Sequence, residues 1–261
     1  MKDYIYKIND DIEFLPIYEP GKPIEEVARE IGIKEDIILK LASNENPLGP
    51  SPAAIKAMHF YADKMNLYPD GGAFFLRRAI AKKLGIAAEE ILVTNGSNEA
   101  IELLAHVFLR RGVEVITGDR AFIIYKLIGM LAGAQVKVLP MPSFKYDINN
   151  ILGAITECTR IIFIGNPNNP TGTMLSQHEI AELVKKVPDD VIICFDEAYI
   201  ELIDPKKQPD TISYVKSRKN VVILRTFSKT YGLAGLRIGY IIAPSASVSY
   251  THLTLPTIYS V

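Results

Sequence analysis

Residues 220–240, NVVILRTFSKTYGLAGLRIGY, begin as an apolar strand and then break into hydroxyl-bearing residues around a single lysine, Lys229. Thr226 and Ser228 precede this lysine, and Arg237 follows it by eight positions. Hydroxyl groups and a guanidinium suit an anionic phosphate, while an amine of adjustable basicity suits nucleophilic chemistry. A solvated surface lysine is the ordinary alternative, but an apolar strand delivers its last residues to the rim of a sheet. The stretch therefore predicts a phosphate site beside a reactive amine.

A carboxylate stands in an equally informative place. Asp196 ends the apolar part of residues 191–199, VIICFDEAY, which predicts a strand buried on both faces. A carboxylate at the end of such a strand needs a cationic partner or several hydrogen-bond donors to remain ionised. A structural ion pair and a functional partner would both meet that need, and the residues alone leave the two explanations open.

Two turns beside predicted strands offer further polar groups. In EILVTNGSNEAIELL, a strand passes through a turn into a helix and leaves the amides of Ser97, Asn98 and Glu99 at a positive helix end suited to phosphate. An ordinary helix cap would give the same pattern. The run RIIFIGNPNNPTG ends in a proline-locked loop that projects three asparagines: Asn166, Asn168 and Asn169. Taken alone, this loop is explained equally well as a turn.

The elements that must position these residues are short β-rich runs with helical stretches between them. The runs cover residues 90–95, 113–118, 134–140, 160–166, 191–199, 220–228 and 237–243. Several are apolar nearly throughout, which is typical of parallel strands covered on both faces by helices. Helical spacing of apolar residues is visible in 98–112, 123–134 and 176–187. The predicted fold class is α/β, a mostly parallel sheet flanked by helices, with ligands at the carboxyl ends of its strands.

The two ends of the chain differ from this pattern. Residues 24–32 predict a short helix, residues 38–52 a strand that leaves into a proline-rich loop, and residues 52–65 a helix that starts at a proline. Residues 246–261, which include the run VSYTHLTLPTIYSV, have no helical periodicity. We therefore expect an arm over residues 1–44, a sheet domain over 45–245 and an aberrant tail over 246–261.

Composition narrows the possible partners. The 261 residues are 48% hydrophobic, and 29 Lys and Arg against 30 Asp and Glu give a net charge of -1. No basic run is long enough to bind a nucleic-acid backbone, so nucleic acid is not an expected partner. The charged amino terminus and the lack of a long apolar stretch predict a cytoplasmic protein without a membrane partner. Cys158 and Cys194 are expected to be reduced, packed thiols, with no disulfide and no metal site.

Six motifs add a family resemblance. NENPLGP, YPDG, GSNEA, NPNNPTG, DEAY and TFSKTYGLAGLRIGY occur in the order seen in the fold-type I pyridoxal-phosphate aminotransferases, and the sequence most resembles their histidinol-phosphate branch. The likeness covers roughly residues 20–245. It implies the large coenzyme-binding domain of that family with its amino-terminal arm. It also implies that the smaller carboxy-terminal domain, with its carboxylate-binding arginine, is missing.

The resemblance assigns roles to the residues singled out above. Lys229 would bind pyridoxal 5'-phosphate covalently and then move a proton between substrate and coenzyme, and Asp196 would keep the pyridine nitrogen protonated. Tyr199 and Asn169 would hydrogen-bond the ring hydroxyl. Phe122 would stack on the ring, although an apolar core position explains it as well.

The remaining roles concern the phosphate, the partner subunit and the substrate. Tyr68 of YPDG would reach the phosphate in a neighbouring subunit, which implies a homodimer with shared sites. Asn46 of NENP would line the substrate entrance. Five residues of this chain would hold the phosphate: Ser97 and Asn98 by helix-end contacts, Ser228 and Arg237 by charge-assisted bonds, and Thr226 by its hydroxyl.

The activity implied by the resemblance is the exchange of an amino group between L-histidinol phosphate and 2-oxoglutarate, in histidine biosynthesis, with small molecules as the only substrates. Another pyridoxal-phosphate aminotransferase, or a decarboxylase resembling those that act on threonine phosphate, is the enzymatic alternative. The alternative of another class is an inactive fragment that only binds the coenzyme. Competing amine substrates would separate the first two, and turnover by the expressed chain would test the third.

Overall fold

The computed structural model describes residue 15 and residues 21–218 and 220–248. Within these residues seven strands form one sheet in the order β1-β7-β6-β5-β4-β2-β3. The strands are β1 (Ile91–Thr94), β2 (Glu114–Gly118), β3 (Gln135–Leu139), β4 (Thr159–Gly165), β5 (Ile192–Asp196), β6 (Val221–Thr226) and β7 (Gly239–Ile242). Six of them fall within the β-rich runs predicted from the sequence and β4 begins one residue before its run, so the predicted α/β class is confirmed.

The direction of the strands gathers polar residues at one edge of the sheet. β7 pairs antiparallel with β1 and with β6, and all the other pairs are parallel. All strands except β7 therefore run the same way and end at one edge. There the register aligns Gly165 with Asp196 and places Gly239 between Thr94 and Thr226. Residues that are far apart in the sequence thus follow the strand ends side by side.

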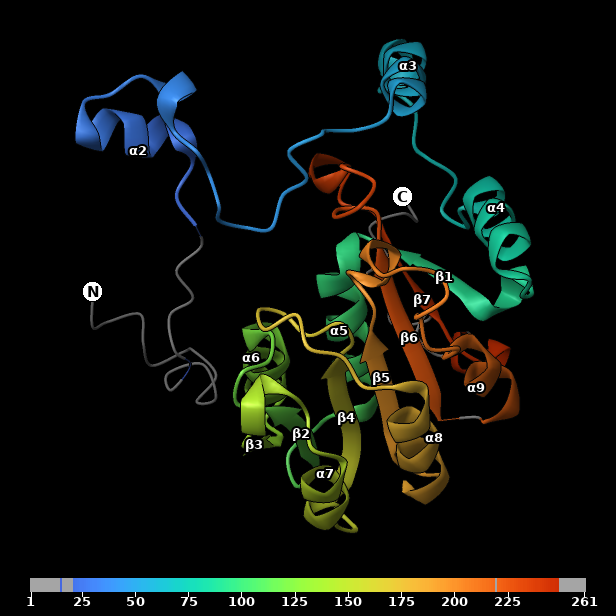
Figure 1. The fold of residues 1–261 in the computed structure, drawn as a ribbon. Coiled ribbons are helices and arrows are strands. Elements are labelled where there is room, and N and C mark those ends of the chain that lie inside the picture. The colour runs from blue at the N-terminus through green and yellow to red at the C-terminus, as the bar shows by residue number, and fades with distance from the viewer. Residues whose placement is uncertain (1–14, 16–20, 219, 249–261) are drawn as a thin grey trace, which may run out of the picture.

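Helices cover both faces of this sheet (Figure 1). The helices with packed faces are α4 (Phe74–Leu84), α5 (Gly96–Phe108), α6 (Ile123–Leu131), α7 (Ile148–Ala154), α8 (Gln177–Lys186) and α9 (Ile212–Ser217). Buried residues of α4, α7, α8 and α9 join the apolar cluster on one face, and those of α5 and α6 join the cluster on the other. The sheet is therefore the middle layer of three.

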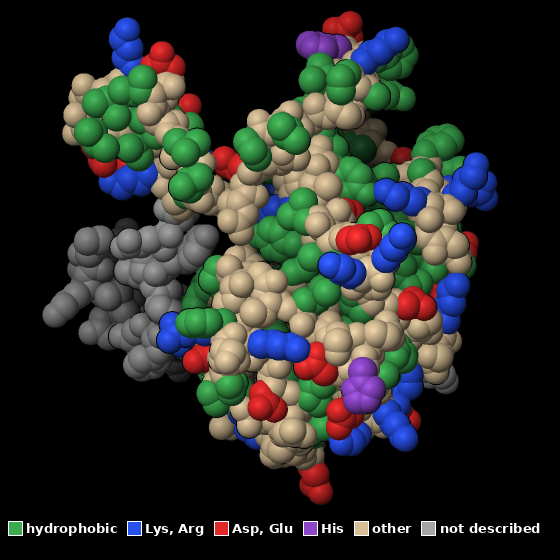
Figure 2. Space-filling model, in the orientation of Figure 1, with side chains coloured by type: hydrophobic (Ala, Val, Ile, Leu, Met, Phe, Trp, Pro, Cys, Tyr) green, Lys and Arg blue, Asp and Glu red, His purple; other side chains and the backbone are tan. Residues whose placement is uncertain are grey.

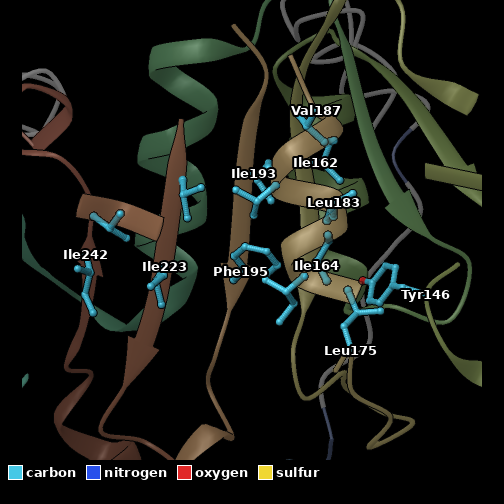
Figure 3. Packing of buried hydrophobic residues seen from close by; sticks show 14 of the residues in the cluster. Tyr146, Ile162, Ile164, Leu175, Leu183, Val187, Ile193, Phe195, Ile223 and Ile242 are labelled. Carbon is cyan, nitrogen blue, oxygen red and sulfur yellow. The ribbon is translucent and has the colours of Figure 1, made fainter. Parts of the chain in front are cut away.

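Side chains of one strand alternate between the two clusters. Ile193 and Phe195 of β5 pack with α8 on the face drawn in Figure 3, whereas Ile192 and Cys194 pack on the opposite face. The four side chains are at most 8% exposed. Burial of one such side chain contributes about 1.5–3 kcal/mol. This two-sided packing explains why the strands are apolar nearly throughout and gives the strand ends a rigid support.

The arm stands apart from the layers. Helices α2 (Ile24–Ile31) and α3 (Pro52–Tyr61) lie away from the sheet (Figure 1), and α3 has no buried residue. Apolar side chains are exposed over this part of the surface (Figure 2), with Leu39 at 81% and Leu48 at 90%. The strand expected at the start of residues 38–52 is not formed, because the segment lies beside no strand that could take its backbone hydrogen bonds.

The two cysteines lie in different surroundings. Both cysteines are free thiols, as expected, but only Cys194 is packed. The expected packing of Cys158 is wrong, because it lies in the exposed turn before β4. Across the described ranges, no helix has the length and apolar character that a membrane crossing requires, and no three His, Cys, Asp or Glu side chains gather as metal ligands would. The predicted tail lies largely outside the described residues.

Candidate functional site

A cavity of about 420 Å³ opens at the edge of the sheet where the parallel strands end. Ten of the side chains singled out from the sequence line it: Ser97, Asn98, Phe122, Asn169, Asp196, Tyr199, Thr226, Ser228, Lys229 and Arg237. They come from the ends of β1, β4, β5 and β6, from the start of α6 and from the turn before β7. The fold therefore brings together groups that lie up to 140 positions apart in the sequence.

Asp196 is the most constrained residue of the cavity. It is the last residue of β5 and is 5% exposed. Its Oδ2 accepts a hydrogen bond of 2.8 Å from the hydroxyl of Tyr125, and its Oδ1 accepts one of 3.2 Å from the amide of Ala198. Burial raises the pKa of Asp196, while the bonds from Tyr125 and Ala198 and the charge of Lys229 oppose that rise. The donors thus partly offset the desolvation of the carboxylate.

Lys229 follows β6 and is half-buried at the same cavity. Its Nζ donates a hydrogen bond of 2.9 Å to the carbonyl oxygen of Ser43 and lies 5.7 Å from the ring centroid of Tyr199. Burial lowers the pKa of Lys229 and Arg237 lowers it further, while Glu45 and Asp196 raise it. An amine with a lowered pKa is more often neutral, which is the form that acts as a nucleophile.

One part of the cavity is suited to an anion. The first amides of a helix have no partner within that helix and carry its positive dipole end, and α5 begins here at Gly96. Arg237 lies against this helix start, because a Cβ at Gly96 would come within 2.5 Å of its Nη2. Its Nη1 also lies 3.4 Å from the hydroxyl oxygen of Ser228. A guanidinium, a hydroxyl and a helix amino terminus therefore converge.

A second glycine lets these elements meet. Gly239 opens β7, and a Cβ there would lie 2.6 Å from the carbonyl carbon of Gly96 and 2.7 Å from the amide nitrogen of Ser97. The hydroxyl of Thr226 accepts from the amide of Ser228 at 3.1 Å and donates to the carbonyl of Ile238 at 3.3 Å. Thr226 thus lines the cavity, but it also fixes the turn that carries Ser228.

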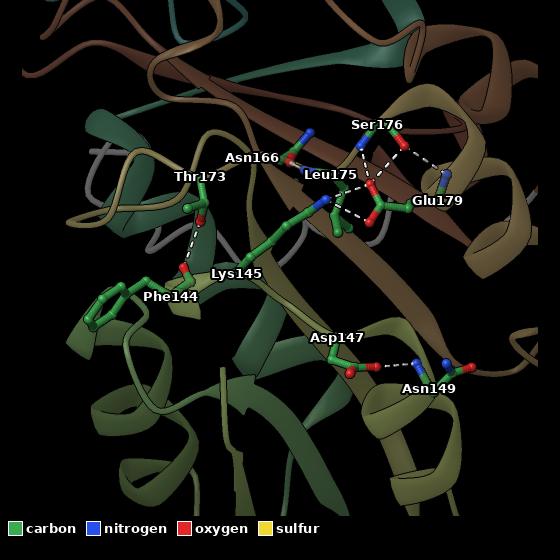
Figure 4. Close-up of polar contacts among 9 residues, drawn as sticks. All are labelled: Phe144, Lys145, Asp147, Asn149, Asn166, Thr173, Leu175, Ser176 and Glu179. Atoms are coloured by element: carbon green, nitrogen blue, oxygen red, sulfur yellow. Dashed lines mark hydrogen bonds and ion pairs between the residues drawn. The ribbon is translucent and has the colours of Figure 1, made fainter. Parts of the chain in front are cut away.

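The loop that carries Asn169 is anchored at both ends (Figure 4). The side-chain oxygen of Asn166 accepts a hydrogen bond of 2.7 Å from the amide of Leu175, and the hydroxyl of Thr173 donates one of 2.7 Å to the carbonyl of Phe144. Of the three asparagines in this loop, Asn169 alone is among the cavity-lining residues of the described chain. The other two support the loop.

The cap of α8 secures the far end of this loop (Figure 4). The hydroxyl of Ser176 accepts from the amide of Glu179 at 3.3 Å, and the Glu179 carboxylate accepts from the amide of Ser176 at 2.7 Å. Lys145 Nζ lies 2.6 Å from the same carboxylate. Burial alone would raise the pKa of Glu179, but the bonds from Lys145 and Ser176 lower it to about 2. The carboxylate therefore remains charged and holds the cap.

Sequence reasoning missed four residues that bring polar side chains to the cavity. Ser43, Asn44 and Glu45 of the arm line it, and the side-chain amide of Asn44 donates a hydrogen bond of 2.9 Å to the hydroxyl of Tyr199. Asn44 and Glu45 stand in the NENPLGP motif beside Asn46, which was an available signal, but the path that brings the arm to the cavity follows from no local pattern. Tyr125 also lines the cavity, and its spacing of three from Phe122 along one helix face was an available signal.

Two predicted residues are not brought to the cavity wall. Asn46 donates from its side chain to the carbonyl of Thr230 at 2.9 Å and accepts from the amide of Leu48 at 3.0 Å. It therefore ties the arm to the loop after Lys229. Tyr68 is 80% exposed and is not among the residues that line the cavity.

Comparison of the sequence with known proteins identifies the family to which the chain belongs. The family model for aminotransferase class I and II matches residues 36–260. The chain belongs to this family of aminotransferases. A histidinol-phosphate aminotransferase of Akkermansia muciniphila is 49% identical over 94% of this chain and 67% of its own length, and one of Moorella thermoacetica is 43% identical over 91% and 61%. The chain thus spans about two thirds of the length of these relatives.

The fold comparison agrees. The crystal structure of a histidinol-phosphate aminotransferase from Sinorhizobium meliloti, described as a complex with pyridoxal-5'-phosphate, matches 98% of this chain and 68% of its own chain with a TM-score of 0.87. The two sequences are 24% identical, so this match supports the fold alone. The predicted fold of the coenzyme-binding domain in this family is confirmed.

Proposed function

We propose that this chain carries the coenzyme site of an aminotransferase that exchanges an amino group between L-histidinol phosphate and 2-oxoglutarate, with pyridoxal 5'-phosphate as coenzyme. One observation carries the proposal. Lys229 and Asp196 line a single cavity together with Arg237, Ser228 and the start of α5. The names of the two relatives agree with it, as does the coenzyme in the Sinorhizobium meliloti complex.

The residues present fit this coenzyme. Its phosphate needs a cationic and hydroxyl-rich cradle, which the close approach of Arg237 to Gly96 supplies. In this proposal Ser97, Asn98, Thr226, Ser228 and Arg237 hold the phosphate. Phe122 stacks on the ring, and Tyr199 and Asn169 hydrogen-bond its hydroxyl. Asp196 faces the ring nitrogen, and the low solvent exposure of its carboxylate strengthens that interaction.

When bound, the coenzyme supplies an electron-withdrawing ring that takes up the electron pair released as a proton leaves the amine-bearing carbon of the substrate. Lys229 would hold the coenzyme through its Nζ and would carry the proton at that same nitrogen. Asp196 would hold a proton on the ring nitrogen. Tyr199, whose hydroxyl accepts a bond from Asn44, would help to hold the ring. Ser43, Asn44 and Glu45 of the arm line the same cavity, and the carbonyl oxygen of Ser43 accepts a hydrogen bond from Lys229.

The amine substrate is tested in a half-reaction. The 261-residue chain is loaded with pyridoxal 5'-phosphate, and L-histidinol phosphate, L-threonine phosphate and L-aspartate are added separately while the visible absorbance is followed. We expect L-histidinol phosphate to convert the coenzyme to its amine form fastest. A faster reaction with another amine would contradict the proposed substrate and indicate another aminotransferase. Release of carbon dioxide from L-threonine phosphate would indicate a decarboxylase. Coenzyme binding without reaction would indicate the inactive fragment.

The proposal includes a second copy of the chain. Three large apolar side chains within nine positions are between 65% and 82% exposed: Leu67, Tyr68 and Phe75. Exposed apolar side chains that gather in this way often mark a surface that another protein chain covers. We propose that a homodimer buries them and that Tyr68 reaches the phosphate of the partner's coenzyme. Asn46 then stands near the entrance for substrate. The cytoplasmic location and the division into an arm, a coenzyme domain and a tail stay predictions.

A further inference from the structure

Tyr125 is a buried tyrosine that the proposed mechanism does not yet use. It lies on α6 and is 1% exposed. Its hydroxyl donates the 2.8 Å hydrogen bond to Oδ2 of Asp196. A hydrogen bond weakens steeply when donor and acceptor are misaligned. The phenol can therefore donate well to the carboxylate only if its ring is held in one orientation.

Aromatic packing holds the ring of Tyr125. It stacks on Phe163 of β4 with centroids 5.0 Å apart and planes 3° from parallel. The ring of Phe122 meets its edge, with centroids 5.7 Å apart at 86°. Both arrangements are favourable for aromatic pairs. Phe122 immediately precedes α6 and Tyr125 lies three positions further on in its first turn, so both residues line the cavity and the hydroxyl of Tyr125 reaches Asp196.

Each oxygen of Asp196 is partly engaged on the protein side. Tyr125 takes one lone pair of Oδ2, and the amide of Ala198 takes one of Oδ1. A carboxylate oxygen has two lone pairs, so each oxygen keeps one acceptor site for the cavity. The two donors, one on each oxygen, fix the plane of the carboxylate. Rotation of the carboxylate would break one bond or the other.

We propose that Tyr125 is a positioning residue, whose phenol orients the Asp196 carboxylate toward the coenzyme ring and stabilises its negative charge. This inference rests on the proposed function. Burial raises the pKa of Tyr125 well above its ordinary value, so the phenol stays protonated and remains a donor. The titratable groups that face Asp196 are on several elements: Tyr125, Tyr146, Cys194, Tyr199 and Lys229.

The test compares Tyr125→Phe with Tyr146→Phe in the 261-residue chain. Tyr146 is a matched control, because it is also buried and its hydroxyl accepts from the amide of Gly165 and does not bond Asp196. The dissociation constant of pyridoxal 5'-phosphate is measured by equilibrium dialysis from pH 5 to pH 9. We expect Tyr125→Phe to weaken binding roughly tenfold at pH 7, the loss expected for one hydrogen bond to a charged group. The pH at which affinity falls on the acid side should rise, because Asp196 loses a donor to its charged form.

A double-mutant cycle separates positioning from packing. In an Asp196→Asn background, Tyr125→Phe should change the dissociation constant by less than about twofold, since its effect passes through the carboxylate charge. If Tyr125→Phe fails to fold by circular dichroism, 3,5-difluorotyrosine at position 125 replaces it. That stronger donor should move the acid side of the profile to lower pH.

Additive effects in the cycle, or a profile equal to that of Tyr146→Phe, would overturn the inference. Lack of coenzyme binding by the unchanged chain would instead overturn the proposed function, and this inference with it.

Discussion

The two charged residues at the centre of the cavity have pKa values displaced toward each other. Burial raises that of Asp196 and lowers that of Lys229, and each charge partly offsets the displacement of the other. Displacements of this kind concentrate at functional sites, because burial of a charge costs stability that a purely structural position would avoid. The chain thus gives up stability where the proposed chemistry needs a buried carboxylate and a neutral amine.

At this scale we expect Asp196→Asn to stabilise the coenzyme-free chain at pH 7 while weakening coenzyme binding at least about tenfold. The raised pKa of Asp196 contributes stability that is present below the ordinary value of 3.8 and is lost as pH rises through the raised value. Asparagine keeps the shape without the charge. Urea unfolding from pH 4 to pH 8 should therefore show a gain in stability that shrinks toward pH 4.

Asp190→Asn is the control, because this carboxylate is exposed. It should leave both the unfolding midpoint and the coenzyme affinity unchanged. An Asp196→Asn variant that is less stable than the unchanged chain at pH 7 and pH 8 would contradict the expectation that the buried charge of Asp196 lowers the free energy of unfolding.

At the scale of elements, the anion end of the cavity depends on how closely β7 approaches the start of α5. Gly239 and Gly96 have no side chains between them, and this contact sets where the helix amides and Arg237 lie. Two elements that are far apart in the sequence thus form one half of the site through backbone contact.

We expect Gly239→Ala to lower the free energy of unfolding by about 1–3 kcal/mol, because its Cβ would press on backbone atoms that cannot turn aside. The shifted helix start should also weaken binding of pyridoxal 5'-phosphate. Gly153→Ala in α7 is the matched control, since a Cβ there meets nothing within 4 Å. It should raise stability by up to about 1 kcal/mol. Equal unfolding curves for the two variants would argue against this contact.

The sequence predicted the strands and the residues at their ends well, because burial on both faces of the sheet requires runs of apolar residues. Seven apolar runs became seven strands, and the polar residues after β1, β4, β5 and β6 reached one cavity, because parallel strands end at one edge. Tyr125 was missed although its spacing of three from Phe122 was an available signal, because the same spacing is typical of two core residues on one helix face. Asn44 was missed because the path of the arm over the cavity depends on contacts such as that between Asn46 and Thr230.

At the scale of the whole molecule, most of the exposed large apolar side chains of the described residues lie between residues 31 and 75, and some of them are visible in Figure 2. The sequence could not predict which surface this would be, because an apolar side chain has the same pattern whether it packs within one chain or between two. The positions assigned to Tyr68 and Asn46 came from the family resemblance alone. Neither lines the cavity within one copy.

We expect the chain to sediment as a dimer at micromolar concentration and Phe75→Glu to weaken that dimer at least about tenfold, because a charge would enter an apolar interface. Phe75 is 82% exposed in α4. Phe144→Glu is the control, as this exposed aromatic residue follows β3 at the far edge of the sheet. A monomeric unchanged chain, or equal sedimentation of the two variants, would contradict the proposed homodimer.

The most direct measurement of the central claim is covalent capture of the coenzyme. The 261-residue chain is incubated with pyridoxal 5'-phosphate, reduced with borohydride, digested and mapped by mass spectrometry. We expect one modified site at Lys229, and its loss in Lys229→Ala while folding is retained. Modification of exposed lysines such as Lys64 and Lys185 to the same extent, or an unchanged visible spectrum in Lys229→Ala, would contradict the proposed coenzyme site.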